Sequence, residues 1–357
     1  MNNLDDIKVR ENLDKMLVGK ALELYLEQME NTWQQVQKAS LPIFKPSALI
    51  FSGMGGSGLA GRIVSGVYEK KVSFPMVVYA DYGLPAWVNE NCLVVANSYS
   101  GNTEETLSAI EEAKKVKARI LGISTGGKLA TMIKNQEFPG VIIQPSANPP
   151  GFPKTGHGIS FAALLGVLSK TEVIPLSVSE FLLTLDSLGK LRGDWLPDVP
   201  LKNNPAKKLA AEIIGKIPLL FSSRPLLGSI HASTNVLHEI GRTFTVYFDF
   251  PEFNHHLVEA FEFPNDIKRK VECLFVHSEF FSDRVKLRYE VVDKLFQEKG
   301  LKISHYYLKG KDILTQAFEQ QHFFAWVAYY SSLLQNSDPG PEEWIIKLKK
   351  LLEQPVH

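Results

Sequence analysis

The stretch Phe51-Ser-Gly-Met-Gly-Gly-Ser-Gly58 lies between a short apolar run at 48–51 and a helical stretch at 60–68. Its glycines permit positive φ angles and a close approach of the backbone to a ligand. The helix that follows presents free N–H groups and the positive end of its dipole, which favour a bound anion. The loop is not a P-loop, because no Gly-Lys-Ser/Thr follows it. It is not a dinucleotide fingerprint either, because the end of the next strand lacks an acidic residue in the expected context, although Asp81 comes close. A tight glycine turn without a ligand is the alternative interpretation.

The apolar runs around this glycine-rich loop (53–58) predict a buried parallel sheet. They are short enough for strands and apolar enough to be buried on both faces, at 48–51, 76–79, 92–96, 119–123 and 141–143. Helical stretches lie between several of them, at 60–68, 104–117 and 129–135. This alternation indicates an α/β fold with helices on both faces of the sheet, a three-layer α/β/α arrangement.

The same alternation returns after residue 206. We expect strands at 218–221, 244–248, 271–276 and 302–308. Helices are expected at 206–216, 228–240, 253–262, 283–299, 312–335 and 341–353. Because the two halves show no obvious sequence identity, only the order of their elements indicates a second domain of the same kind.

A chain of 357 residues is long enough for about two domains. We expect an N-terminal helical arm at 1–45, a first α/β domain at 46–170 and a second at 206–357. A linker rich in proline and glycine, with one helix at 179–188, would join them over 171–205. The arm reads as a pair of amphipathic helices that packs either on its own domain or on a partner subunit.

Composition narrows the class of protein. The 39 basic and 39 acidic residues balance, which argues against a nucleic-acid binder that depends on bulk charge. No apolar run of about 18 residues predicts a membrane span, and the N-terminus lacks a signal pattern, so we expect a cytoplasmic protein. Two cysteines, Cys92 and Cys273, cannot form a disulfide framework and are expected to be buried thiols.

A second loop, Asn97-Ser-Tyr-Ser-Gly-Asn-Thr103, follows the expected strand at 92–96 and ends where the helix at 104–117 begins. Its hydroxyl groups can donate hydrogen bonds to phosphate oxygens, although Thr103 alone could be an N-cap. Both loops would open at the carboxyl edge of one parallel sheet, where such sheets bind ligands. The glycine-rich loop and this hydroxyl-rich loop (97–103) therefore predict a site for the phosphate of a small molecule.

Together the two loops resemble the phosphosugar-binding loops of the sugar isomerase (SIS) superfamily. The similarity is greatest to the bifunctional phosphoglucose/phosphomannose isomerases, which have two SIS domains with the active site between them. The resemblance covers about residues 45–350. It implies that the phosphate is bound by Gly55, Gly56, Ser57, Ser98, Ser100 and Thr103.

Three segments of the second half match the same family. His238-Glu-Ile-Gly-Arg242 stands where the family has Asn-Glu-Asn-Ala-Lys, so Glu239 corresponds to the base that transfers the proton. Pro251-Glu-Phe-Asn-His255 follows, with His255 sixteen residues after Glu239, in the place of the histidine that assists ring opening. Asp338-Pro-Gly-Pro341 and Ile345-Ile-Lys-Leu-Lys349 come last, so Lys349 matches the ring-opening lysine.

The match has departures. Lys154 in Phe152-Pro-Lys154 replaces a family arginine, and lysine is a point charge rather than a planar fork. From the residues alone, Glu239 and Lys349 could be solvated charges on helices. His256 could act in place of His255, and His157 could face the ligand or be a loop histidine. The adjacent histidines also suggest a metal, but no third ligand is well spaced.

Interconversion of an aldose and a ketose phosphate requires one carboxylate that moves a proton between C1 and C2, and a cation where enediolate charge develops. Glu239, His255, Lys349 and Lys154 supply the required types. The resemblance implies glucose 6-phosphate and fructose 6-phosphate as substrates, with mannose 6-phosphate left open, and neither cofactor nor metal. It also implies a homodimer in which the histidine comes from the neighbouring subunit. The alternatives are a non-catalytic sugar-phosphate sensor and an isomerase of an amino sugar.

Overall fold

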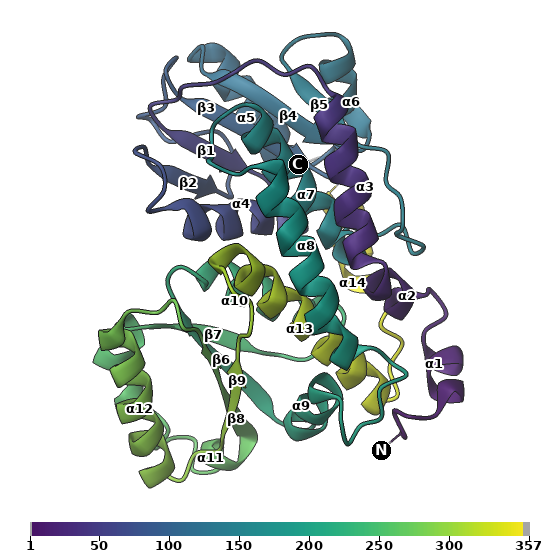
Figure 1. Cartoon of the computed structure of the whole chain (residues 1–357), viewed down its shortest axis with the longest axis vertical. Coiled ribbons are helices and arrows are strands. Elements are labelled where there is room, and N and C mark those ends of the chain that lie inside the picture. The colour runs from purple at the N-terminus through teal and green to yellow at the C-terminus, as the bar shows by residue number, and fades with distance from the viewer. Residues whose placement is uncertain (1, 353–357) are drawn as a thin grey trace.

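The computed structural model describes residues 2–352, which contain two parallel sheets with helices between and around them (Figure 1). The first sheet has the strand order β2-β1-β3-β4-β5. Every residue of β1 and β3 is buried, which explains their unbroken apolar runs. The strands are β1 (Leu49–Ser52), β2 (Met76–Tyr79), β3 (Leu93–Ser98), β4 (Arg119–Ser124) and β5 (Gly140–Ile142).

The helices of the first sheet include one that periodicity did not predict. The expected ones are α4 (Gly55–Tyr68), α5 (Glu104–Lys115) and α6 (Gly127–Lys134). The unexpected one is α7 (His157–Lys170), which follows a 3₁₀ turn, η1 (Pro153–Thr155). Helix α7 packs against both α3 (Tyr25–Lys38) and α4, so it is apolar around its whole circumference and has no amphipathic stripe.

The second sheet has the order β7-β6-β8-β9 and is also parallel, as predicted. Its strands are β6 (Ile217–Ser223), β7 (Val246–Phe250), β8 (Val271–His277) and β9 (Ile303–Tyr307). Its helices are α9 (Pro205–Ile213), α10 (Leu227–Glu239), α11 (Ile267–Lys270), α12 (Asp283–Glu298) and α13 (Ile313–Leu334).

The prediction of a helix at 253–262 is wrong. Two 3₁₀ turns occupy this region, η3 (Glu252–His255) and η4 (Leu257–Glu259). Phe253 is fully buried beneath the turns, and Phe261 adopts a φ of 75°, which an α-helix cannot accommodate.

Helices α4, α10 and α13 join the two halves of the molecule. All residues of α13 after Ile313 are buried, and it packs against α8 (Val178–Arg192), α9 and α10 (Figure 1). Helix α10 also packs closely on α4. A Cβ at Gly228 would collide with the backbone of Arg62, and one at Gly66 would collide with the carbonyl of Pro225. These glycines therefore permit the close contact between the two helices.

The N-terminal arm contains three helices rather than a pair: α1 (Ile7–Leu13), α2 (Val18–Glu23) and α3. Of the two options, packing on its own chain is what the structure shows. The buried stripe of α3 contacts α7, and its Trp33 stacks on Phe181 of α8 with ring centroids 3.9 Å apart. Helix α8 is longer than the helix expected at 179–188 and is followed by η2 (Gly193–Trp195).

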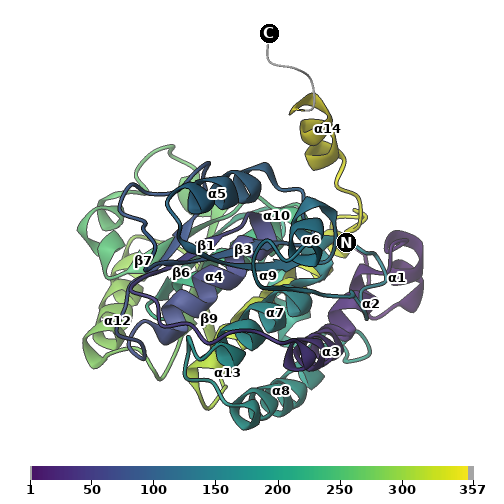
Figure 2. The ribbon, with the colours of Figure 1, turned by 90° about the horizontal axis from the view of Figure 1, so that it is seen from above.

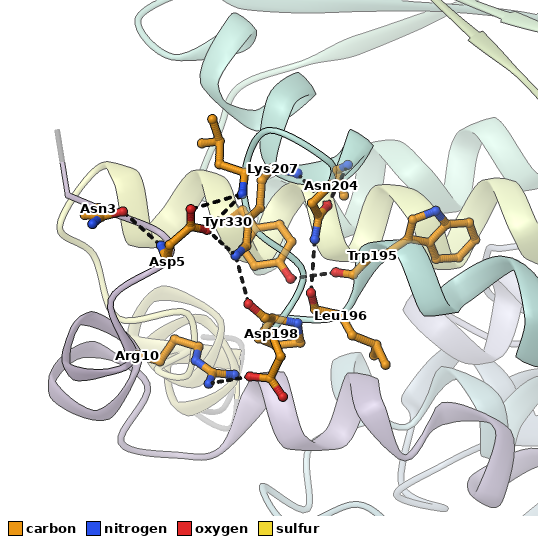
Figure 3. A network of polar contacts seen from close by, with 12 residues as sticks. Asn3, Asp5, Arg10, Trp195, Leu196, Asp198, Asn204, Lys207 and Tyr330 are labelled. Atoms are coloured by element: carbon orange, nitrogen blue, oxygen red, sulfur yellow. Dashed lines mark hydrogen bonds and ion pairs between the residues drawn. The ribbon is translucent and has the colours of Figure 1, made fainter.

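A buried lysine ties the start of the chain to the segment between the halves (Figure 3). Lys207 is fully buried, and its Nζ donates 2.8 Å hydrogen bonds to Asp5 Oδ1 and to the carbonyl of Pro197. Its ammonium also lies 5.6 Å from the ring centroid of Tyr330. The hydroxyl of Tyr330 in turn donates to the carbonyl of Trp195, at 2.6 Å. This network anchors α9 and α13 to the N-terminal segment.

We expect Asp5→Ala to lower the free energy of unfolding by about 2–3 kcal/mol, because it leaves the ammonium of Lys207 buried without its carboxylate. The Lys207 hydrogen bond lowers the pKa of Asp5, so this stabilisation is present above about pH 4 and is lost as the pH falls and Asp5 becomes protonated. Urea unfolding at pH 7 and pH 3 measures both effects. Asp198→Ala is the control, since its pair with Arg10 is exposed and should contribute under about 0.5 kcal/mol.

The last helix, α14 (Glu343–Leu352), projects from the body of the molecule (Figure 2). None of its residues is buried, and its apolar side chains are exposed, among them Trp344, Leu348 and Leu351. Within residues 2–352, no helix combines the length and apolar character needed to cross a membrane.

Candidate active site

Hydrogen bonds hold the glycine-rich loop and the hydroxyl-rich loop side by side at the carboxyl edge of the first sheet. Ser57 Oγ accepts a hydrogen bond from the backbone N–H of Tyr99, at 3.2 Å. The side chain of Asn97 donates to the carbonyl of Ser57, at 3.1 Å. These contacts follow from the sheet order, because β1 and β3 are neighbours and each loop continues one of them.

The hydroxyl groups of the second loop converge. Ser98 Oγ and Thr103 Oγ1 lie 2.8 Å apart, and Ser98 Oγ also accepts the N–H of Gly101 at 3.0 Å. Gly101 has a φ of +71°, which favours glycine at this turn. Ser100 is exposed and accepts the N–H of Asn102 at 3.3 Å. Thr103 occupies the N-cap position of α5 but makes no side-chain capping bond, so its hydroxyl faces Ser98 instead.

Three helices begin at this place without a side-chain cap. Helices α4, α5 and α7 all lack a capping hydrogen bond from a side chain. Gly55 and Gly56 begin α4 and place no side chain over its first turn. Uncapped N–H groups and the positive ends of the helix dipoles favour an anion at this place.

The turn that contains Lys154 packs against both loops. A Cβ at Gly156 would lie 3.2 Å from the Tyr99 ring, and Asn148 donates to the hydroxyl of Tyr99 at 3.2 Å. Lys154 points away from the loops toward the second half of the chain. Its Nζ donates to the carbonyls of Glu239 (3.3 Å) and Pro339 (3.1 Å). The Lys154 side chain therefore connects the turn beside the glycine-rich and hydroxyl-rich loops to the end of α10.

Glu239 is the last residue of α10 and has an altered acidity. Burial raises its pKa to about 7, and the neighbouring carboxylate of Glu342 adds to this increase, while Lys154 and Lys349 oppose it. Lys154 is itself 3% exposed and lies 3.7 Å from Glu342 Oε1, and burial lowers its pKa. A carboxyl group with a pKa near 7 can accept and return protons at neutral pH.

Two residues that the sequence analysis did not propose complete this region. Arg242 donates to the carbonyls of Asp338 (3.1 Å) and Pro341 (2.6 Å), which fixes the turn before α14. That turn delivers Glu342 to Lys154. The sequence feature that could have indicated Glu342 is its position directly after Asp338-Pro-Gly-Pro341. That segment matches the family and was used to assign Lys349.

His255 does not lie with Glu239 in the same chain. Helix α10 ends at the edge of the sheet where β7 begins, whereas His255 follows the opposite end of β7. The five residues of β7 span about 16 Å, at roughly 3.3 Å per residue. His255 is exposed, and the neighbouring His256 is exposed and paired with Glu252 at 3.0 Å. Within a single chain, Glu239 and His255 therefore lie apart.

Comparison with known proteins identifies the family of this chain. Residues 202–352 match the family described as bacterial phospho-glucose isomerase C-terminal SIS domain. The bifunctional phosphoglucose/phosphomannose isomerase of Caldicellulosiruptor bescii is 30% identical over 86% of this chain and 89% of its own length. The chain belongs to the bifunctional phosphoglucose/phosphomannose isomerase family.

Two further relatives extend the similarity over nearly the whole chain. The Aquifex aeolicus protein of the same name is 28% identical over 94% of this chain and 98% of its own length. A crystal structure of a glucose-6-phosphate isomerase-like protein from Thermus thermophilus superposes with a TM-score of 0.60 at 19% identity, covering 96% of this chain and 99% of the other. The α/β fold of two parallel sheets is therefore shared with that crystal structure.

Proposed function

We propose that this protein interconverts glucose 6-phosphate and fructose 6-phosphate through an enediol intermediate. The observation that supports this most is the carboxyl group of Glu239, which has a pKa of about 7. Glu239 lies beside Lys154, and Lys154 belongs to the turn that packs against the two loops. A base, a cation and an anion site are the groups that an aldose–ketose isomerase requires. The family relationship points to the same reaction.

In this mechanism the phosphate is bound by the first turn of α4 and by Ser57, Ser98, Ser100 and Thr103. Glu239 removes the proton from C2 of the open aldose and returns it to C1, so the carboxylate is regenerated within one turnover. Lys154 stabilises the negative charge of the enediolate, because its ammonium is buried and lies at the backbone carbonyl of Glu239. Lys349 and a histidine assist ring opening.

We further propose a homodimer, because His255 lies far from Glu239 of its own chain and would reach a site only in a second copy. The domain boundaries follow the two sheets: a helical arm at 1–45, SIS domains at 46–170 and 206–357, and a connecting segment at 171–205. A cytoplasmic location and a second activity on mannose 6-phosphate belong to the same proposal.

The test is an isomerase assay on the purified chain. Fructose 6-phosphate is supplied, and the formation of glucose 6-phosphate is coupled to a dehydrogenase, with mannose 6-phosphate tested in parallel. Turnover supports the proposal, and the result with mannose 6-phosphate decides between single and dual specificity. Thermal stabilisation by these sugar phosphates without turnover would instead support a non-catalytic sensor.

We expect Glu342→Gln to shift the acidic limb of the pH profile of kcat/KM to lower pH by about one unit. In the parent protein Glu239 must lose its proton to act as the base, so kcat/KM should rise with pH through about 7. Removal of the Glu342 charge lowers the pKa of Glu239 and leaves Lys154 free to lower it further. Glu343→Gln, an exposed neighbour, is the matched control and should leave the profile unchanged.

A further inference from the structure

His157 is a buried side chain at the phosphate loops to which the proposed mechanism assigns no role. It is the first residue of α7 and is 5% exposed. The edge of its ring faces the first turn of α4: a Cβ at Gly56 would lie 3.1 Å from His157 Cδ2 and 3.3 Å from Nε2. The imidazole thus borders the place where Gly55 and Gly56 leave room for a ligand.

The tautomer of His157 is fixed by a residue from the second half of the chain. Gln321 of α13 places its amide nitrogen 2.9 Å from His157 Nδ1. With the Gln321 amide in this orientation its nitrogen donates and Nδ1 accepts, which places the ring proton on Nε2. Among residues 2–352, the only hydrogen bond of the His157 ring is this one at Nδ1, so Nε2 is left without a partner. Nε2 is not fully sealed from solvent, so its N–H is accessible to a ligand beside the first turn of α4.

The surroundings keep the ring neutral. Burial lowers the pKa of His157 to about 4, and the ring stacks on Phe161 with centroids 5.7 Å apart. His322 of α13 is also buried, and burial is the main cause that lowers its pKa. A neutral imidazole at pH 7 can donate a hydrogen bond to a developing oxyanion without transferring its proton.

The ring lies between the first turn of α4 and the segment that carries Lys154. The hydroxyl groups of Ser98 and Thr103 are on the other loop, whereas His157 contacts Gly56 and lies three residues after Lys154. Since Lys154 reaches the carbonyl of Glu239, a donor on this turn lies between the phosphate loops and the proposed base.

We propose that His157 is a catalytic residue that donates its Nε2–H to a sugar oxygen on which enediolate charge develops, with Gln321 as the positioning residue that sets the tautomer. This inference rests on the proposed isomerase function. No bond to His157 is formed or broken: the substrate proton moves from carbon to Glu239 and back to carbon, and the Nε2–H remains on the ring throughout.

Paired substitutions test the donor. For His157→Phe we expect kcat on fructose 6-phosphate to fall by about 100-fold while KM changes less than about threefold, because a donor to the transition state is lost. His157→Gln offers an amide N–H at similar reach and should recover at least a tenth of the parent kcat. An unchanged kcat in His157→Phe, or a glutamine variant no better than phenylalanine, would overturn the proposal.

A measurement on the parent protein gives an answer even if a variant does not fold. In ¹⁵N NMR of the histidine rings, we expect His157 to carry its proton on Nε2, and Gln321→Leu to weaken this preference. Fructose 6-phosphate should shift the Nε2–H signal, and inorganic phosphate should not. A signal unmoved by fructose 6-phosphate, or moved equally by inorganic phosphate, contradicts a sugar contact. Absence of turnover in the parent protein would instead defeat the isomerase proposal, and this titration would still report on binding.

Discussion

Glu239→Gln should reduce kcat on fructose 6-phosphate by about 10⁴-fold while the affinity for the sugar phosphate changes less than about threefold. The substitution keeps the size of the side chain but removes the group that would accept the proton from carbon. Phosphate binding should persist, because Ser57, Ser98 and Thr103 belong to loops of the other sheet. Coupled assays give kcat, and isothermal titration with fructose 6-phosphate gives the affinity.

The stability of this variant separates lost chemistry from lost folding. The pKa of Glu239 is raised to about 7 in the folded state, so ionisation destabilises the folded chain as pH rises from about 4.5 through 7. Glutamine avoids this cost, and Glu239→Gln should unfold at an equal or higher temperature than the parent protein at pH 8. Substantial turnover in a folded Glu239→Gln protein would show that the base assignment is wrong.

The proximity of the glycine-rich loop and the hydroxyl-rich loop could be predicted from the sequence because two local signals agreed. Each loop follows an apolar run and precedes a helix, and parallel strands deliver such loops to a single edge of the sheet. The contact between Ser57 and Tyr99 follows directly from the pairing of β1 with β3. The second sheet was predicted from the same alternation of elements, and its strands appear at the expected places.

Other features depend on tertiary contacts that no local pattern encodes. Helix α7 lies between two layers and has no amphipathic stripe, so periodicity missed it. The region of 253–262 is rich in residues that permit a helix, but burial of Phe253 and the positive φ of Phe261 decide its path. Glu342 reaches Lys154 only because Arg242 fixes the preceding turn, a contact across almost one hundred residues of sequence.

The separation of Glu239 and His255 leads to the second large effect, subunit complementation. His255→Ala and Glu239→Gln should each give an almost inactive homodimer. When the two proteins are mixed and their subunits exchanged, about half of the dimers contain one chain of each kind. If each site combines Glu239 of one chain with His255 of the other, one of the two sites in a mixed dimer is intact. We therefore expect about a quarter of the parent activity to return.

The outcome distinguishes the two possible architectures. If His255 served the site of its own chain, each chain in a mixed dimer would still lack one group, and mixing would restore nothing. His256→Ala is the matched control, because His256 is an exposed neighbour paired with Glu252. It should retain activity alone, whereas an inactive His256→Ala protein that complements Glu239→Gln would transfer the role to His256. Since both histidines lie beyond the far end of β7, recovery in either case requires a second copy of this chain at the site.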